Sequence, residues 1–176
     1  MNQNAKQEVI SWIKTVGLAI LLAWVVTSFL IVNATVPTGS MENTIMTGDR
    51  IIANRLAYWQ GEPQRGDIAV FRYPDDPSGK VLFVKRIIGL PGDVVEVKEG
   101  QVYINGESTA LEEPYLKETA YGNFGPYEVP EGEYFMMGDN RNNSLDSRSW
   151  RNHYVPKKDI LGKVLFRYFK GFKWLA

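Results

Sequence analysis

The most prominent pattern in the chain is an apolar stretch near its beginning. Residues 16–32 contain no charged side chain, and the stretch extends back to Trp12 if Lys14 is included. A helix over residues 12–32 is about 31 Å long, which matches the hydrocarbon core of a bilayer. Lys14 lies within one turn of the end of this helix, where its flexible side chain can reach the interface. The pattern therefore predicts a transmembrane helix over residues 12–32.

Two other interpretations of this stretch remain open. One is a cleavable signal peptide, because residues 32–34 (Val-Asn-Ala) loosely resemble a cleavage site. Signal peptides, however, have a shorter apolar region of about 7–15 residues. The other is a buried core helix, which is seldom apolar on every side over such a length. We favour the membrane anchor, because the stretch is too long for the first alternative and too uniformly apolar for the second.

The distribution of basic residues predicts how this helix is oriented. Lys6 and Lys14 lie at its beginning, and the next basic residue is Arg50. Positive charges flanking a span remain on the cytoplasmic side. We therefore expect a single-pass protein of the cell membrane, with residues 1–11 as a cytoplasmic tail and residues 33–176 as an extracytoplasmic domain.

After residue 32 the pattern changes to short alternating or apolar runs bounded by glycine, proline and aspartate, which is typical of β-strands. Turn signals at Glu99-Gly100 and Asn105-Gly106 predict a hairpin over residues 93–105. A helical turn or two is expected within residues 49–59, and a long loop over residues 112–130. The domain is thus predicted to be mostly β. Its predicted strands are residues 67–73, 81–89, 93–98, 101–104, 134–137 and 163–169.

Charge and rare residues narrow the possible chemistry. The formal net charge is zero, but residues 33–147 carry 10 basic and 18 acidic groups, whereas residues 148–176 carry 8 basic and 1 acidic. The basic end could face anionic lipid or nucleic acid, or pair with the acidic middle of the domain, and we favour the pairing. The absence of cysteine excludes disulfides, thiol nucleophiles and cysteine-ligated zinc. His153 is the only histidine, which argues against a metalloprotease.

Ser40 is the first candidate for chemistry. It follows Gly39 in the sequence Pro-Thr-Gly-Ser-Met, and a glycine at this point permits the tight turn on which nucleophilic serines often lie. A serine in a loop is by itself a weak signal. Its position is more informative, because it follows the predicted span by eight residues, which reach at most about 28 Å when extended. Ser40 is therefore expected near the bilayer surface.

Lys85 is the second candidate. On a strand over residues 81–89 it shares a face with Val81, Phe83 and Ile87. Apolar neighbours desolvate a lysine and lower its pKa, and a neutral lysine can act as the general base for a serine. The strand alone equally suits a lysine that extends into solvent from a sheet edge. Arg86 lies on the opposite face and stays protonated, so we expect it to form an ion pair.

The third candidate is the polar segment over residues 138–148, which reads Gly-Asp-Asn-Arg-Asn-Asn-Ser-Leu-Asp-Ser-Arg. It shows neither helical nor strand periodicity, and its short polar side chains favour turns and local hydrogen bonds. It could be an exposed loop. It does not match an EF-hand, which needs a glycine at loop position 6 and a glutamate at position 12.

Together these segments resemble type I signal peptidases, a family of Ser-Lys serine proteases. The family's Ser-Met-x-Pro-Thr box after the membrane anchor is similar to residues 40–44, and its Gly-Asp-Ile-Val-x-Phe box to residues 66–71. Its lysine box, close to Val-Lys-Arg-Ile-Ile-Gly-Leu-Pro-Gly-Asp, is repeated in full at residues 84–93. Its last box, Gly-Asp-Asn-Arg-x-Asn-Ser-x-Asp-Ser-Arg, is matched by residues 138–148. Order and spacing agree along nearly the whole chain.

The resemblance implies a role for each of the candidate residues. Ser40 would be the nucleophile and Lys85 the general base. Ser144 would hydrogen-bond the lysine amine and orient it. Asp146 and Arg148 would support the last box beside this pair.

The resemblance also implies an oxyanion hole, a fold and a substrate. The backbone N–H of Ser40 would bind the oxyanion, together with the hydroxyl of Thr38. The fold would be an antiparallel β-sheet catalytic domain around the two residues, with an apolar surface against the lipid bilayer. The substrates would be the signal peptides of preproteins, cut after a small residue with another small residue two positions earlier. No cofactor, metal or nucleic acid is implied.

The sequence departs from the family motif at one position, and three other hypotheses for its function remain. The family's usual proline in the first box is Asn43 here, which puts the local loop conformation in doubt. A self-cleaving repressor-type protease shares the Ser-Lys pair but needs a DNA-binding segment, and we find none. The other rivals are a non-catalytic anchored domain that binds envelope partners, and a secreted binding protein from which residues 1–32 are removed.

Overall fold

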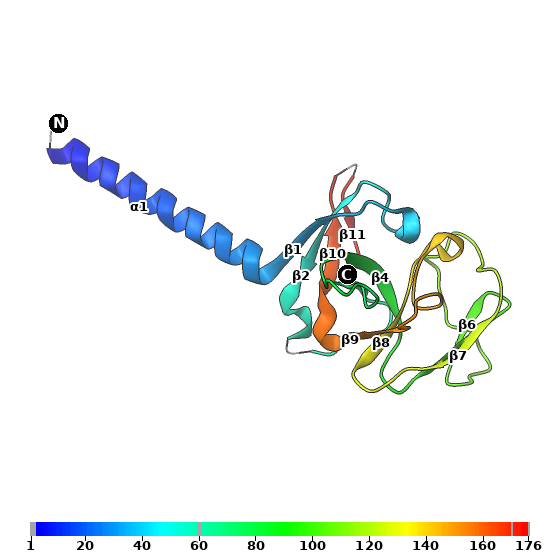
Figure 1. Ribbon diagram of the computed structural model, residues 1–176. Helices are drawn as coiled ribbons and strands as arrows, with labels where there is room; N and C mark the ends of the chain where they lie inside the picture. The colour runs from blue at the N-terminus through cyan, green and yellow to red at the C-terminus, as the bar shows by residue number, and fades with distance from the viewer. Residues whose placement is uncertain (1–2, 60, 170, 176) are drawn as a thin grey trace.

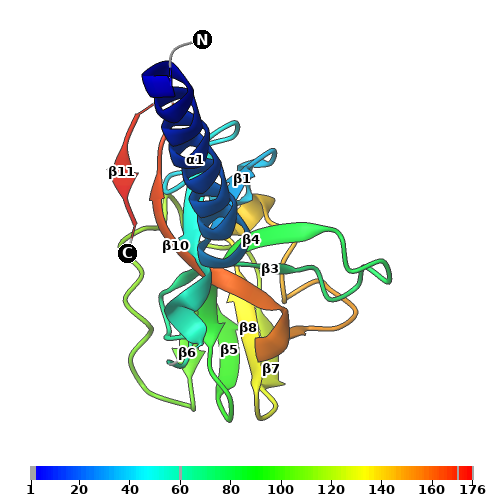
Figure 2. The same cartoon turned by 90° about the vertical axis from the view of Figure 1, so that its left-hand side faces the viewer.

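The computed structural model describes residues 3–59, 61–169 and 171–175. Parts of the predicted tail and C-terminal segment, including Lys170, lie outside these residues. Helix α1 (Gln3–Val25) continues into a single π-helical turn, η1 (Val26–Leu30), and projects away from the rest of the protein (Figures 1 and 2). It is long and apolar enough to cross a membrane, and none of its most apolar window is buried. The alternative of a buried core helix is therefore wrong.

The end of the predicted span needs a correction. The helical conformation ends at Leu30, and strand β1 (Ile31–Thr35) follows directly. Ile31 and Val32 were predicted in the helix, but both pair with β2 (Arg50–Asn54), and Val32 is buried in the core of the domain. An apolar run shows no boundary between a span and a buried strand, because both require apolar side chains. The helix thus joins the sheet without a flexible linker.

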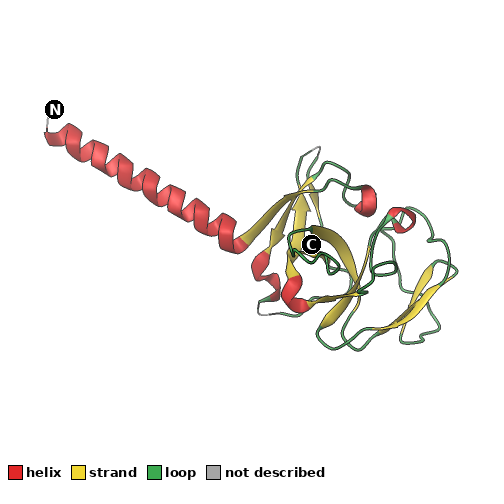
Figure 3. Ribbon diagram, in the orientation of Figure 1, coloured by secondary structure: helices red, strands yellow, loops and turns green. Residues whose placement is uncertain are grey.

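The main body is a curled, antiparallel sheet of eight strands (Figure 3). Its strands run in the order β1-β2-β10-β3-β4-β8-β9, with the short β11 added beside β10. Every pairing in it is antiparallel, so the predicted fold class is confirmed. The further strands are β3 (Ile68–Arg72), β4 (Leu82–Gly89), β8 (Glu133–Met137), β9 (Tyr154–Pro156), β10 (Ile160–Arg167) and β11 (Lys173–Trp174).

A second sheet of three strands lies at the end of the domain away from the helix (Figure 1). The predicted hairpin is confirmed as β5 (Val94–Lys98) paired with β6 (Gln101–Ile104). The predicted loop over residues 112–130 is wrong in part, because it contains β7 (Phe124–Glu128), which pairs with β5. Its central Gly-Pro step obscured the strand pattern, since both residues are depleted in strands.

The segment over residues 49–59 holds a strand as well as the predicted helical turn. Residues of β2 alternate between buried and less buried positions, and only then does a 3-10 turn, η3 (Arg55–Tyr58), begin. The Asn54 side chain starts this turn by accepting a hydrogen bond from the Leu56 backbone N–H. Another 3-10 turn, η5 (Lys157–Asp159), joins β9 to β10.

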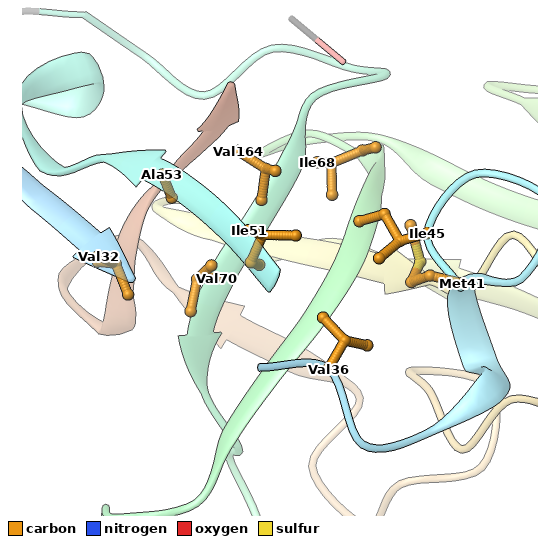
Figure 4. Packing of buried hydrophobic residues seen from close by; sticks show 9 residues of the cluster. All are labelled: Val32, Val36, Met41, Ile45, Ile51, Ala53, Ile68, Val70 and Val164. Carbon is orange, nitrogen blue, oxygen red and sulfur yellow. The ribbon is translucent and has the colours of Figure 1, made fainter. Parts of the chain in front are cut away.

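Packing of the first core cluster fixes the loop that carries the candidate serine (Figure 4). Met41 and Ile45 of this loop are fully buried against residues of β2 and β3. Burial of one such side chain contributes about 1.5–3 kcal/mol. The loop is therefore held to the sheet immediately after Ser40. The cluster consists of Val32, Val36, Met41, Ile45, Ile51, Ala53, Ile68, Val70 and Val164.

Candidate active site

Ser40 lies in a 3-10 turn, η2 (Gly39–Met41), and is 8% exposed. The third predicted segment contacts the turn from the far end of the sequence. Asn140 donates its backbone N–H to the Ser40 carbonyl oxygen at 3.0 Å and its side-chain N–H to the Gly39 carbonyl oxygen at 2.9 Å. Two hydrogen bonds and the buried Met41 therefore fix the backbone on both sides of the Ser40 side chain.

Lys85 lies on β4, in the interior of the large sheet and not at its edge. Its Cα partner on β3 is Ala69, and β8 pairs with β4 on the other side. Its side chain is buried, with the residue 3% exposed, so the alternative of a solvent-reaching edge lysine is wrong. Its Nζ lies 2.5 Å from the Ser40 Oγ and 5.2 Å from the centroid of the Phe83 ring. The structure thus places the amine and the hydroxyl in direct hydrogen-bond contact.

The electrostatics of Lys85 favour its neutral form. Burial lowers the pKa of Lys85 to about 8, because desolvation disfavours the ammonium. The nearby carboxylates of Asp146 and Asp139 act in the opposite direction, whereas Arg148 acts in the same direction as burial. With a pKa near 8, about a tenth of the molecules carry a neutral amine at pH 7, far more than for a free lysine.

Asp146 and Arg148 form a buried ion pair beside these two residues. The Arg148 guanidinium donates two hydrogen bonds to the Asp146 carboxylate, each 2.9 Å long, and a third to the Arg141 carbonyl oxygen at 2.6 Å. Asp146 also accepts the Gly138 backbone N–H at 3.0 Å. The ion pair therefore closes residues 138–148 into a fixed loop against the serine turn.

Ser144 occupies the expected neighbourhood but not the expected contact. Its hydroxyl oxygen is buried and has no hydrogen-bond partner among the described residues, so the predicted bond to Lys85 is not formed. The hydroxyl lies instead against the Gly138 backbone, where a Cβ on residue 138 would overlap both Ser144 and the Ser40 carbonyl oxygen. Glycine is required at this position because the two segments approach so closely.

Arg86 forms the predicted ion pair on the opposite face of β4. It donates two hydrogen bonds to Asp139, at 2.8 and 2.6 Å, and one to the Gly66 carbonyl oxygen at 2.7 Å. Thr44 donates its hydroxyl to the same carboxylate at 2.5 Å. Asp139 is 1% exposed and was not identified from the sequence as the partner of Arg86. With these contacts, the ion pair connects all four motif boxes.

An apolar cleft of about 420 Å³ opens beside the Ser40–Lys85 contact. Thr38 lies at its wall with an exposed side chain whose hydroxyl makes no capping hydrogen bond to η2. Two lining residues, Asn143 and Leu145, were not singled out in the sequence, although they flank Ser144 in the third segment. The cleft is lined by residues 34–40, Val70, residues 81–85, Asn143 and Leu145.

A family model described as "Signal peptidase, peptidase S26" matches residues 9–169. The chain belongs to this signal peptidase family. The match begins within α1, so the helix is part of the sequence that the family shares, which favours an anchor over a leader that is removed. As a family member the chain is a serine endopeptidase, and the alternative of a non-catalytic binding domain is wrong.

Individual signal peptidases agree along most of the chain. "Probable signal peptidase I-2" of Synechocystis sp. is 40% identical over 159 residues, covering 89% of this chain and 71% of that protein. "Signal peptidase I" of Bacillus licheniformis is 38% identical over 176 residues, covering 94% and 91%. A solved structure of a signal peptidase I from Enterococcus faecalis V583 is 35% identical, with a TM-score of 0.49, covering 58% of this chain and 96% of that one.

The departure from the signal peptidase motif at Asn43 has a structural basis. Asn43 has a φ of 82°, in the left-handed region. Proline is fixed near −65° and cannot adopt this conformation, whereas asparagine tolerates it better than most residues. The loop after Ser40 therefore follows a path here that the family's usual proline does not permit.

Among the described residues there is no group of three or more His, Cys, Asp or Glu side chains that could hold a metal ion.

Proposed function

We propose that this protein is a membrane-anchored signal peptidase that cleaves signal peptides from exported preproteins, with Ser40 as the nucleophile and Lys85 as the general base. The observation that carries the proposal is the 2.5 Å contact between the Lys85 Nζ and the Ser40 Oγ, buried beside an apolar cleft. A serine hydroxyl is a weak nucleophile until a base removes its proton. A neutral lysine at this distance can remove it.

The reaction then proceeds in two stages. The neutral Lys85 amine takes the Ser40 proton as the Oγ attacks the scissile carbonyl carbon, and the backbone N–H of Ser40 and the hydroxyl of Thr38 stabilise the oxyanion. Collapse of the tetrahedral intermediate breaks the peptide C–N bond, and the Lys85 ammonium gives its proton to the leaving amine. Lys85 next takes a proton from water as the water oxygen attacks the acyl-enzyme ester. It returns this proton to the Ser40 Oγ as the ester C–O bond breaks and the signal peptide leaves with a free carboxylate.

The cleft supports a preference for small side chains before the cut. Its walls beside the dyad include Ala34, Val36, Val70 and Phe83, which are apolar. Two shallow apolar subsites within this cleft would exclude large side chains sterically and provide no polar partner for charged ones. We propose that the substrate carries a small residue directly before the cut and another two positions earlier.

The helix supports the proposed topology. We propose that residues 12–30 span the cell membrane, with residues 1–11 in the cytoplasm and the β-domain outside, because Lys6 and Lys14 lie at the beginning of the span. Because β1 follows the helix directly, this topology would hold the domain at the bilayer surface, where a membrane-inserted preprotein emerges. The proposed chemistry needs no cofactor.

The test is cleavage of a preprotein by the purified full-length chain. Ser40→Ala and Lys85→Ala should each reduce the rate at least about a hundredfold while the protein remains folded. Ser108→Ala and Lys98→Ala, which alter the same residue types at exposed positions, are the matched controls and should cleave at the wild-type rate. A rate above about a hundredth of wild type in either dyad variant would remove that residue from the mechanism.

Substrate choice is tested separately by a scan of the residue before the cut. Alanine and glycine there should support efficient turnover, whereas leucine and phenylalanine should not. Efficient cleavage after leucine or phenylalanine would contradict the proposed small pockets without affecting the roles of Ser40 and Lys85.

A further inference from the structure

The segment over residues 111–119, which we name the strap, lies against the Arg86 side of β4, opposite the dyad. Tyr115 is its main contact with the site. The ring centroid of Tyr115 lies 3.7 Å from the Arg86 guanidinium carbon, so the ring stacks directly on the buried cation. Such stacking favours the charged arginine and excludes water from its flat face.

The strap is held in place by a buried ion pair. Glu113 accepts two hydrogen bonds from Arg141, at 2.8 and 2.5 Å, and their side chains are 5% and 0% exposed. Tyr115 donates its hydroxyl to Glu113 at 2.6 Å. Burial and the Glu113 carboxylate both raise the pKa of Tyr115, so its hydroxyl remains a donor. Bidentate, charge-assisted pairs of this kind fix geometry strongly. The ring is therefore held over Arg86 and is not a mobile surface aromatic.

Asn43 ties the strap to the loop of the nucleophile. Its side-chain N–H donates to the Tyr115 carbonyl oxygen at 2.8 Å. Asn43 is only three residues after Ser40, and its left-handed conformation is the one that proline cannot adopt. The residue that departs from the family motif thus provides a contact between the serine loop and the strap.

The Arg86–Asp139 ion pair lies between the strap and the dyad. Asp139 precedes Asn140, whose backbone N–H holds the Ser40 carbonyl oxygen. A displacement of Asp139 would therefore be transmitted to Ser40 through a single residue, Asn140. Its carboxylate also acts on Lys85 by charge, and Arg86 neutralises it through two short hydrogen bonds.

We propose that Tyr115 is a positioning residue for the active site: by covering the Arg86–Asp139 ion pair, the strap keeps water out and fixes both the Ser40 loop and the charges around Lys85. The proposal rests on the Ser40–Lys85 mechanism above. Tyr115 touches neither dyad residue, and it acts through Arg86 and Asp139.

The charges that face Lys85 give the sign of the expected effect. Asp146 and Asp139 favour the ammonium, and Arg148 opposes it. Asp146 is paired with Arg148, which the Tyr115 ring does not cover. The ring covers Arg86, so its removal changes the charge that Asp139 presents to Lys85. Without the ring, water enters and Arg86 separates from Asp139. Both changes favour the ammonium and raise the pKa of Lys85.

The test is the pH dependence of kcat/KM for the full-length chain carrying Tyr115→Ala. The ascending limb should move up by about 0.5–1 pH unit, so that activity at pH 7 falls by about 3–10-fold, while KM changes less than about twofold. Tyr115→Phe keeps the ring, and its kcat/KM should rise over the same pH range as that of the wild type. Tyr121→Ala, which removes an aromatic ring two residues after the strap that is 75% exposed, is the matched control.

A second variant covers the case in which Tyr115→Ala does not fold. Asn43→Gly accepts the left-handed conformation and removes only the side-chain contact to the strap. It should move the limb in the same direction by a smaller amount. The proposal would be overturned if kcat/KM rose at the wild-type pH in every folded variant. It would also be overturned if the rise in Tyr115→Phe were displaced as far as that in Tyr115→Ala.

An NMR titration of the Lys85 amine separates this proposal from the proposed function. An upward displacement in Tyr115→Ala supports the strap even if Ser40→Ala were to remain active, an outcome that would overturn the dyad alone. If the Lys85 amine titrates at the wild-type pH in folded Tyr115→Ala, the proposed role of Tyr115 is overturned, whatever the dyad variants show.

Discussion

Lys85 and Arg86 are neighbours on β4 that face two different regions of the protein. Both are buried, at 3% and 8% exposure. Lys85 faces the cleft, where it contacts a hydroxyl and an aromatic ring, and no carboxylate among the described residues forms an ion pair with it. Arg86 faces a polar network, where Asp139 binds it with two hydrogen bonds. A buried base becomes neutral where no counterion touches it, and a buried guanidinium stays charged where one does.

The largest expected effect on activity comes from a substitution that places a permanently charged side chain on the Lys85 face of β4, as Arg86 already does on the other face. Lys85→Arg keeps the positive charge and most of the length but cannot lose its proton near neutral pH. Cleavage of a soluble peptide should fall by about 10²–10⁴-fold, the usual contribution of a general base. Wild-type activity of this variant would show that a fixed charge, and not a neutral amine, is what Ser40 requires.

Removal of the buried cation on the other face of β4 should also lower stability. Arg86→Met leaves Asp139 buried without its cation, and breaking a buried ion pair in this way costs about 3–5 kcal/mol. Urea unfolding of the full-length chain in detergent measures the loss. Arg72→Met, whose ion pair to Asp159 is longer and partly exposed, is the control and should cost less than about 1 kcal/mol.

Thr38→Val tests the cleft side without altering the base. The substitution keeps the shape and removes the hydroxyl proposed to bind the oxyanion. Loss of one such donor costs about 10²–10³ in kcat in well-studied cases, and a smaller loss is expected here because the Ser40 backbone N–H remains. An unchanged kcat would mean that Thr38 only lines the cleft.

Removal of the helix should have the smallest effect on soluble peptides. Both faces of β4 lie in the β-domain, so a chain that begins at Ile31 should keep kcat on a peptide within about threefold and lose more on membrane-inserted preproteins. A chain that begins at Asn33 lacks the buried Val32 and should be less stable by about 1.5–3 kcal/mol. Equal losses on both substrates would give the helix a structural role in the site.

The sequence predicted which candidate residues come together better than it predicted the contacts that hold them in place. The strand, and the opposite faces on which Lys85 and Arg86 lie, follow from a period of two in a short apolar run, whereas the burial of Lys85 did not follow from that pattern. The Asp139 partner of Arg86 and the ring of Tyr115 did not emerge, because contacts between residues distant in the sequence leave no local pattern. Ser144 shows the reverse case, since it lies in the segment beside the Ser40 turn but does not form the hydrogen bond to Lys85 that the family motif implied.

The lowered pKa of Lys85 also has a consequence for stability. The unfolded chain carries an ordinary lysine near 10.5, whereas the folded one has a pKa of about 8. Folding is therefore opposed below pH 10.5, by an amount that increases as the pH falls towards 8 and is constant below it. The full cost is about 3 kcal/mol. Lys85→Met removes the charge and should be more stable than wild type at pH 7, with the difference shrinking as the pH rises from 8 to 10.5.

The most direct test of the account is the ionisation of Lys85 in the intact enzyme. We would measure kcat/KM against pH for the wild type, together with an isotope-edited NMR titration of the Lys85 amine. The account predicts that activity rises through an ionisation near pH 8, and that the amine titrates at the same pH. An amine that titrates near the free-lysine value of about 10.4 would contradict the neutral-lysine mechanism.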